Sequence, residues 1–445
     1  MDIKKAFIPI LFLFSSCLFA CNTPPPEPPP HENIPCEIHE YGHWSSSVLP
    51  TCTESGEAKR TCSVCGHTET KELSIIAHEH IDSICIHCGH MRVSEGLSFT
   101  SNGDGTCALT GIGTCYETVI VVPDRSPDGD LVTSIADRAF YSEVGDIDRA
   151  VFHFQKIILP DGMTSIGDFA FYGCDALVSI HLPESITSIG EGAFSSCSSL
   201  TEIAIPNGVT RINYATFSAC SSLARVTLSS RLLEIREYAF SRCSSLKELT
   251  IPDKLLRIGA YAFESCGLVS LALPDSITEI GEGAFEFCSS LTDATLPTQI
   301  KEIPDSLFMA CFQLKSVNLP PALTAIGNRA FERCKELQSI ELPSTLTHLG
   351  ESAFSDCRSL TAITLPSGIT VLEFHLFSSC TKLVSVTIRG DVTRIGEFAF
   401  SWCTELASIH FNGTTEKWNA IVKGHDWNYM LSEVKIICTN GELTA

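Results

Sequence analysis

The chain has 445 residues and a formal net charge of −22 at pH 7. Lys and Arg do not cluster anywhere along it. Nucleic-acid binding needs concentrated positive charge against phosphates, so this composition excludes a nucleic-acid partner. The acidity favours solubility and carries little information about the fold.

Residues 1–20 have the pattern of a secretory signal peptide. Two lysines precede an apolar run that ends at Ala20. Such a run is typical of export signals and is too short to cross a bilayer as a helix. The end of the run, Leu18-Phe19-Ala20-Cys21, resembles a bacterial lipobox, with a departure at Phe19. The resemblance implies lipidation of Cys21, and a plain signal peptide cut near Ala20 is the alternative.

Residues 21–35 are a proline-rich linker, with six prolines between Pro24 and Pro30. Runs of this kind form extended polyproline II, which rises about 3.1 Å per residue. A cysteine with several acyl chains gives stable anchoring, so the linker is expected to be a stalk above the membrane. The predicted location is the cell envelope, lipid-anchored at the outer membrane or cell surface, with a periplasmic orientation still open.

Residues 36–95 form a module rich in Cys and His. It contains two similar knuckles, Cys62-Ser63-Val64-Cys65-Gly66-His67 and Cys85-Ile86-His87-Cys88-Gly89-His90, with 19 residues between Cys65 and Cys85. This spacing is typical of a structural zinc site built from two turns, and glycine after the second cysteine permits positive φ. The predicted zinc ligands are Cys62, Cys65, Cys85 and Cys88.

Disulfides are the alternative for this module, because exported cysteines often pair. Its six cysteines allow fifteen connectivities, and mixed arrangements stay open. The stretch from Pro50 to Gly66 resembles a short module of many bacterial surface proteins, P-T-C-T-x-x-G followed by T-C-x-x-C-G. That resemblance implies a small stapled unit and identifies no ligand.

Residues 96–158 are predicted to cap the N-terminal end of a repeat array. Alternating residues flank the turn Asn102-Gly103-Asp104-Gly105, which favours a β-hairpin. Val119–Val122 then resembles a repeat strand. Terminal units of repeat arrays are atypical because they cover an open end of the core.

Residues 159–412 repeat one unit, L-P-x-x-[IV]-T-x-I-G-x-x-A-F-x-x-C-x-x-L-x-x-I-x. Its eleven cysteines are separated by nine intervals of 23 residues and one of 22, and a phenylalanine precedes each cysteine by three residues. They are Cys174, Cys197, Cys220, Cys243, Cys266, Cys288, Cys311, Cys334, Cys357, Cys380 and Cys403. A single unit cannot bury enough surface to fold alone, so the units must stack.

Each unit predicts one coil of a β-rich solenoid. Ile203-Ala204-Ile205 has a strand pattern that ends at Pro206, because proline cannot donate to a ladder. The G-x-x-A-F-x-x-C segment suits a helical or 3₁₀ turn with its Phe and Cys on one side. Stacked cysteines point the same way, so we expect buried free thiols rather than disulfides. The glycine that follows isoleucine in the repeat, here called the glycine slot, is replaced by proline at Pro304. Proline cannot take positive φ, so this turn is not expected to require a left-handed backbone.

This repeat resembles the BspA-like leucine-rich-repeat family of bacterial surface proteins, including its treponemal variant. Residues 159–412 carry the pattern throughout, and residues 413–445, with Trp418 and Trp427, resemble the C-terminal cap of that family. The resemblance implies a leucine-rich-repeat solenoid of 23-residue coils. It also implies a surface-exposed or secreted binding protein that adheres to host or microbial partners.

One strand residue in each coil is expected to face outward in register. These residues form a column rich in threonine, and the predicted ligand-binding face consists of His181, Thr227, Thr250, Thr295, Asn318, Glu341, Thr364, Thr387 and His410. Threonine also suits any exposed strand, which is the plainer explanation residue by residue. Solenoids nevertheless use such faces for binding.

No enzyme motif interrupts the repeat, so the sequence predicts no catalytic residue. The favoured function is a surface-displayed, lipid-anchored interaction or adhesion module. Its expected partners are protein or glycan ligands, with host extracellular matrix among them, and the membrane through the lipid anchor. The alternatives are a structural envelope or matrix protein without a host ligand, and an exported metal-binding protein.

Overall fold

The computed structural model describes residues 39–52, 54–75, 77, 80–81, 84–85, 92–142 and 153–445. The chain forms two compact units, Met1–His78 and Glu79–Ala445. The division falls inside the stretch 36–95 that the sequence grouped as one module. The expected signal peptide and the lipidated linker, with Cys21, lie outside the described residues.

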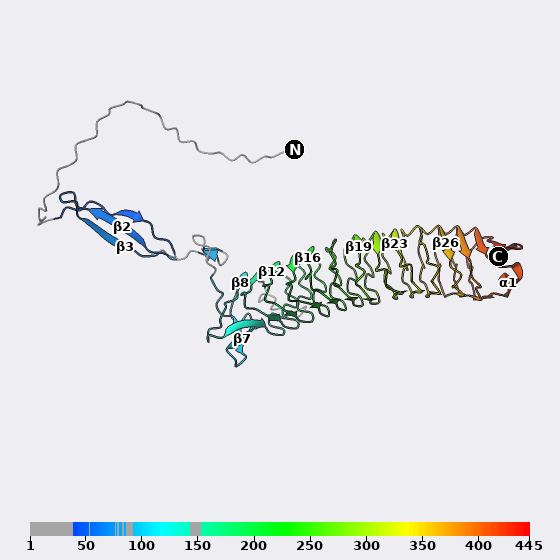
Figure 1. Ribbon diagram of the computed structural model, residues 1–445, viewed down its shortest axis with the longest axis horizontal. Coiled ribbons are helices and arrows are strands. Elements are labelled where there is room, and N and C mark those ends of the chain that lie inside the picture. Colours follow the sequence, from blue (N-terminus) through cyan, green and yellow to red (C-terminus); the bar gives the residue numbers. More distant parts are fainter. Residues whose placement is uncertain are drawn as a thin grey trace, which may run out of the picture. The chain divides into compact units, whose positions relative to one another are not determined.

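The first unit contains a three-stranded antiparallel sheet (Figure 1). Its strands are β1 (Ser45–Val48), β2 (Gly56–Thr61) and β3 (Thr68–Leu73), in the order β1-β2-β3. The first knuckle, from Cys62 to His67, is the turn that joins β2 to β3. In the second unit, β4 (His80–Ile81) and β5 (Ile84–Cys85) form a short antiparallel pair.

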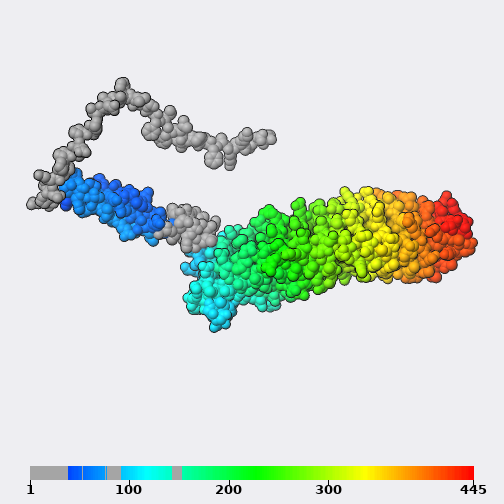
Figure 2. Space-filling view, viewed as in Figure 1, coloured from blue at the N-terminus to red at the C-terminus, as the bar shows by residue number. Residues whose placement is uncertain are grey.

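The second unit is a β-solenoid of about 14 coils of about 23 residues each, with almost no helix. The colours of Figure 2 follow one another along its length, so sequence order is also spatial order. Every coil therefore contacts its sequence neighbours, which is the arrangement that the repeat predicted.

Two parallel ribbons run along the solenoid (Figure 1). The first ribbon consists of β8 (Val119–Val121), β10 (Lys156–Ile158), β12 (Ser179–His181), β14 (Glu202–Ala204), β16 (Arg225–Thr227), β19 (Ser270–Ala272), β21 (Asp293–Thr295), β23 (Ser316–Asn318), β26 (Ala362–Leu365), β28 (Ser385–Ile388), β30 (Ser408–Phe411) and β32 (Lys435–Cys438). At 248–250 and 339–341 the chain forms no strand, so this ribbon divides into three sheets.

The second ribbon follows in the same coils and is mostly made of two-residue strands. It consists of β9 (Leu131–Ile135), β11 (Ser165–Ile166), β13 (Ser188–Ile189), β15 (Arg211–Ile212), β17 (Glu234–Ile235), β18 (Arg257–Ile258), β20 (Glu279–Ile280), β22 (Glu302–Ile303), β24 (Ala325–Ile326), β25 (His348–Leu349), β27 (Val371–Leu372), β29 (Arg394–Ile395) and β31 (Val422–Lys423). Isoleucine pairs with isoleucine in successive coils, as Ile166 does with Ile189, so the register keeps the apolar residues inward.

The third side of each coil is made of turns that also form a ladder between coils. Phe169, Phe171 and Gly173 donate their N–H groups to the carbonyls of the next coil at 2.7–2.9 Å. Phe169 and Gly173 have positive φ, 54° and 72°, so alternate N–H groups point along the solenoid axis. Within the coil, turns are closed by i→i+3 hydrogen bonds such as Cys174 N–H to Phe171 O. The left-handed residues prevent these turns from continuing into a helix.

The glycine slot has no left-handed backbone, as the sequence predicted: Gly190 is absent from the positive-φ residues. Glycine is still favoured there, because a Cβ on Gly190 would lie 2.5 Å from the Asp168 nitrogen of the preceding coil. Asn213 and Arg236 fill the equivalent slots of the next two coils. The positive-φ positions instead lie two and six residues further along each coil, where the consensus carried no glycine signal.

The core is one continuous column of phenylalanine rings beside one of cysteines. From Phe171 to Phe400, successive rings stack at centroid distances of 5.1–6.0 Å. Each repeat cysteine is a buried free thiol. Its Sγ lies 3.0–3.2 Å from the phenylalanine carbonyl of the preceding coil. The prediction of buried thiols is confirmed.

Both ends of the core are covered. At the N-terminal end, the hairpin of β6 (Ser98–Ser101) and β7 (Thr106–Gly111) pairs with β9. At the C-terminal end, β33 (Gly441–Thr444) pairs antiparallel with β32, and the short helix α1 (Thr415–Ala420) buries Trp418. These terminal elements therefore cover the two ends of the core, as expected for the atypical end units of a repeat array.

Candidate functional site

The outward residues of the first ribbon form the candidate binding surface, here called the ribbon face. It comprises the nine residues predicted as ligand-binding: His181, Thr227, Thr250, Thr295, Asn318, Glu341, Thr364, Thr387 and His410. All are exposed except Thr387, which is half-buried. Register pairs within the sheets, such as Thr295 with Asn318 and Thr387 with His410, align the members that lie in strands. Thr250 and Glu341 fall at the two breaks, where the ribbon has no strand. The inward neighbours Ile203 and Ile363 are buried, so the alternation predicted from sequence is present.

Charge on the ribbon face is sparse for such an acidic chain. Arg225 and Glu202, on adjacent strands, form an exposed ion pair at 2.5 Å. Such a pair contributes little stability. Most of the other outward residues are hydroxyl-bearing or small, so a partner would meet hydrogen-bonding groups rather than a strong field.

Shallow hollows lie on this surface near both ends of the ribbon. One of about 560 Å³ is lined by Glu341, Thr364, Ser367 and Arg389. A second of about 400 Å³ is lined by Thr387, His410 and again Arg389. A third of about 350 Å³ lies over β10 to β16. The ribbon face therefore offers recesses for side groups of an extended ligand.

Arg389 is the distinctive cation of these hollows. It stands where the repeat normally has proline, as at Pro366 one coil earlier. Its side chain is exposed, and no carboxylate pairs with it in the described part of the chain. Arg389 was not among the binding residues predicted from the sequence, although the departure is visible there. Its charge was the available signal for a role in binding.

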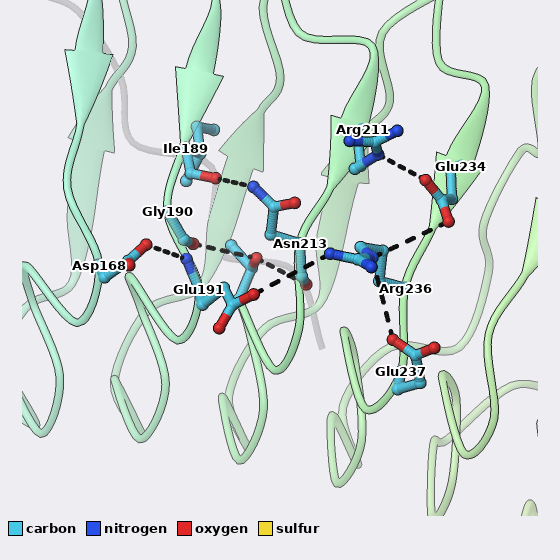
Figure 3. Close-up of polar contacts among 10 residues, drawn as sticks. Asp168, Ile189, Gly190, Glu191, Arg211, Asn213, Glu234, Arg236 and Glu237 are labelled. Carbon is cyan, nitrogen blue, oxygen red and sulfur yellow. Dashed lines mark hydrogen bonds and ion pairs between the residues drawn. The ribbon is translucent and has the colours of Figure 1, made fainter.

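A different polar arrangement lines the second ribbon (Figure 3). Asp168 accepts the Glu191 N–H at 2.8 Å, and the Asn213 amide donates to the Ile189 carbonyl at 2.7 Å. Arg236 lies 3.9–4.0 Å from the carboxylates of Glu191, Glu234 and Glu237. The Asp168 and Asn213 contacts join successive coils and satisfy backbone groups. The Arg236 ion pairs lie beside them, and we assign the whole arrangement to the architecture.

The first compact unit contains a convergent cluster of metal-ligand type. Ligand atoms of His39, Cys62 and Cys65 all lie within 4.8 Å of one another. The Cys65 Sγ and the His39 Nδ1 are 3.2 Å apart. Gly66 has φ 73°, as predicted for glycine after the second cysteine. Cys88 and the side chain of Cys85 lie outside the described residues, and His39 was missed as a ligand because it precedes both knuckles.

The thiols of the molecule differ in ionisation. Burial raises the pKa of Cys62, but N–H groups of Cys65 and Val64 and the His39 ring stabilise its thiolate, and its pKa falls to about 6. Burial instead raises the pKa of the repeat thiols, as at Cys334 and Cys380. A thiol that stays protonated is neither a nucleophile nor a ligand. The repeat cysteines therefore belong to the core.

The repeat defines the family. Residues 133–269, 226–337 and 324–421 match the family described as BspA type leucine rich repeat region, in six copies. These ranges cover well over half of the 445 residues, so the chain belongs to this bacterial family. Leucine-rich-repeat proteins are in general non-enzymatic binding scaffolds, and members of this family are typically surface-associated.

Solved structures agree with this assignment. A leucine rich cell surface protein of Faecalibacterium prausnitzii A2-165 is 31% identical, with 74% of this chain and 97% of that chain covered and a TM-score of 0.50. A leucine-rich repeat protein of Bacteroides ovatus is 24% identical over 78% and 100% of the two chains, with a TM-score of 0.57. The pneumococcal vaccine antigen PcpA shares the fold at 18% identity, 79% and 99% coverage and a TM-score of 0.57.

Among proteins of curated function, none matches this chain. In the part of the chain that the structure describes, no helix is long and apolar enough to cross a membrane.

Proposed function

We propose that the protein is held at the cell envelope by lipid on Cys21 and binds protein or glycan partners through the ribbon face. The observation that carries the proposal is the column from His181 to His410, exposed in register over a rigid core. Strands of one ribbon are spaced by about 4.8 Å, so six coils present about 30 Å of contact length. That span suits an extended chain of a protein or a sugar polymer.

The composition of the face sets the expected chemistry of binding. Hydroxyl and amide groups at Thr295, Asn318 and Thr364 can donate and accept hydrogen bonds. Because the parallel strands hold these groups in place, little side-chain entropy is lost on contact, which favours affinity. At the C-terminal end, the unpaired Arg389 adds a cation that suits a carboxylate or sulfate on the partner.

Binding by this face can be tested with the full mature chain on panels of extracellular-matrix proteins and glycans. The double variant Thr295→Arg/Thr364→Arg places bulky charge on the ribbon face and should weaken binding at least tenfold. Its matched control, Thr210→Arg/Thr370→Arg, changes exposed threonines outside that face and should bind as the parent does. Equal loss in both variants would argue against a specific face.

Display and anchoring need separate measurements. Cys21→Ser should remove the acyl chains from the mature protein by mass and release it from the membrane fraction. Protease treatment of intact cells should degrade the anchored parent. Protection from protease, together with retained anchoring, would place the chain in the periplasm and contradict display at the cell surface.

A further inference from the structure

The knuckle at Cys62 is built by the sheet of the first compact unit. The Cys62 N–H donates to the His67 carbonyl at 2.8 Å, and the Gly66 N–H donates to the Cys62 carbonyl at 3.0 Å. The Val64 N–H points at the Cys62 sulfur at 3.4 Å. An N–H directed at sulfur favours a thiolate over a thiol. The turn therefore presents both cysteine sulfurs on the same side, and a backbone N–H already donates to one of them.

A second segment brings His39 to this turn. Tyr41 forms an antiparallel bridge with Cys62, and the Arg60 guanidinium lies 4.3 Å from the centre of the Tyr41 ring. The His39 ring then packs against both Tyr41 and His67, at 5.4 Å and 5.2 Å between ring centres. The bridge and the ring contacts fix the direction of the imidazole. Its Nδ1 consequently faces the Cys65 sulfur at 3.2 Å.

We propose that His39, Cys62 and Cys65 bind one divalent metal ion of the zinc class. Two thiolates and an imidazole are the donors that zinc prefers. Two sulfurs bound tetrahedrally at about 2.3 Å from one ion are about 3.8 Å apart, so ligand atoms already within 4.8 Å need only a small contraction. The fourth position falls to water or to the adjacent His67.

This ligand set differs from the four-cysteine site expected from sequence. All three residues lie in the compact unit Met1–His78, whereas Cys85 and Cys88 follow its end. The two knuckles then serve different units, and the metal staples the first one by joining the segment before β1 to the β2–β3 turn. The inference stands independently of the binding function proposed for the ribbon face.

Cobalt is a suitable probe, because its thiolate charge-transfer absorption reports sulfur ligands directly. The reduced, metal-free mature chain should bind one Co²⁺ and show the thiolate charge-transfer bands, and Zn²⁺ should displace the Co²⁺. His39→Ala should weaken Co²⁺ binding at least tenfold, and His39→Cys should restore it. Cys62→Ser should abolish the bands. His43→Ala, at an exposed histidine of the same unit, is the matched control and should leave the Kd unchanged.

The variant Cys85→Ser/Cys88→Ser separates the two ligand sets. If it retains the cobalt bands, the site belongs to His39, Cys62 and Cys65. If it loses them while His39→Ala does not, the four-cysteine site is correct and the proposal is wrong. Mass spectrometry of protein isolated from cells without reductant gives the other decisive result. A Cys62–Cys65 disulfide there would overturn metal binding. Circular dichroism of each variant guards against loss of the fold.

Discussion

The buried inner positions and the exposed outer positions of the solenoid differ in how much their residues vary from coil to coil. On the inner side, phenylalanine and cysteine occupy their columns in the eleven coils that carry the full repeat, and every one is buried. On the outer side of the first ribbon, the same register holds His, Ala, Thr, Asn and Glu. An inner residue touches its copies above and below, so a change in one coil disturbs three. An outer residue meets solvent, and this freedom lets a repeat fold carry binding specificity.

The hydrogen bonds of the cysteine column explain why the buried positions hold the same residues from coil to coil. From Phe171 to Phe377, each phenylalanine carbonyl of the column accepts two hydrogen bonds: the N–H of the cysteine in its own coil, and the thiol of the cysteine in the next coil. For Phe263 these are the Cys266 N–H at 3.1 Å and the Cys288 thiol at 3.1 Å. A buried carbonyl has two lone pairs to satisfy. Cysteine thus fills space as a small hydrophobe and also donates across the coil boundary.

The largest expected effect is a loss of stability at alkaline pH, which tests whether the buried cysteine column stays protonated. Burial holds the pKa of nine repeat thiols above the ordinary value of 9.0, at Cys174, Cys197, Cys220, Cys243, Cys288, Cys311, Cys334, Cys357 and Cys380. Native thiols stay protonated above pH 9 while unfolded ones ionise, so stability falls as the pH rises. At pH 10 the cost is about 1.4 kcal/mol for each thiol, or on the order of 10 kcal/mol together.

Thermal unfolding of the reduced chain at pH 7 and pH 10 measures this loss. Cys288→Ala removes one titrating thiol, so its Tm should fall less between the two pH values than that of the parent. Maleimide labelling of the native chain at pH 7 should leave the repeat cysteines unmodified. Rapid labelling of several of them before unfolding would contradict a closed column of protonated thiols.

The next effect comes from opening a cavity in the aromatic column. Phe263→Ala removes a buried ring that stacks on Phe240 and Phe285 at 5.4 Å and 5.5 Å. Such changes cost about 3–5 kcal/mol. Because the interface between coils carries the stability of a solenoid, hydrogen exchange should accelerate most in the coils beside residue 263. Phe263→Leu should cost less, and Thr250→Ala on the ribbon face should change stability by under about 0.5 kcal/mol.

Most of the fold could be predicted from sequence because the repeat determines which residues contact one another. A period of 23 residues fixes which residues stack, and the alternation around Ile203 fixes which side faces in. The left-handed turn residues could not be predicted. Tyr238 and Arg329 occupy them with φ 57° and 56°, although such conformations are costly for bulky side chains. The hydrogen bonds between coils select this backbone, and the local sequence does not.

The two candidate sites, the ribbon face and the His39, Cys62 and Cys65 cluster, also differ in how far they could be predicted from sequence. The ribbon face was predictable because it is the complement of the core column in each strand. The ligand His39 was not, because it reaches Cys65 only through the bridge between Tyr41 and Cys62. Cys62 and Cys65 were found from a local spacing. Contacts between segments of one small sheet leave no such periodic signal.

The smallest predicted effect concerns an acidic cluster on the turn side. Burial, with the neighbouring carboxylates of Glu264 and Glu282, raises the pKa of Glu286 from 4.5 to about 7, and Arg329 opposes the rise. The folded state then binds a proton more tightly than the unfolded state between these values. Stability is therefore retained below pH 4.5 and is lost as the pH rises toward 7. Since the side chain is partly exposed, solvent screening limits the loss to roughly 1 kcal/mol.

Glu286→Gln removes that titration while keeping the shape of the side chain. Its Tm should exceed that of the parent at pH 8 by about 1–2 °C and should match it at pH 4.5. Glu351→Gln, at an exposed glutamate of another coil, should shift the Tm equally little at both pH values. If Glu286→Gln gave the same shift at pH 4.5 and pH 8, the carboxyl would not be titrating in the folded state. The outer surface would then tolerate charge as freely here as it does on the ribbon face.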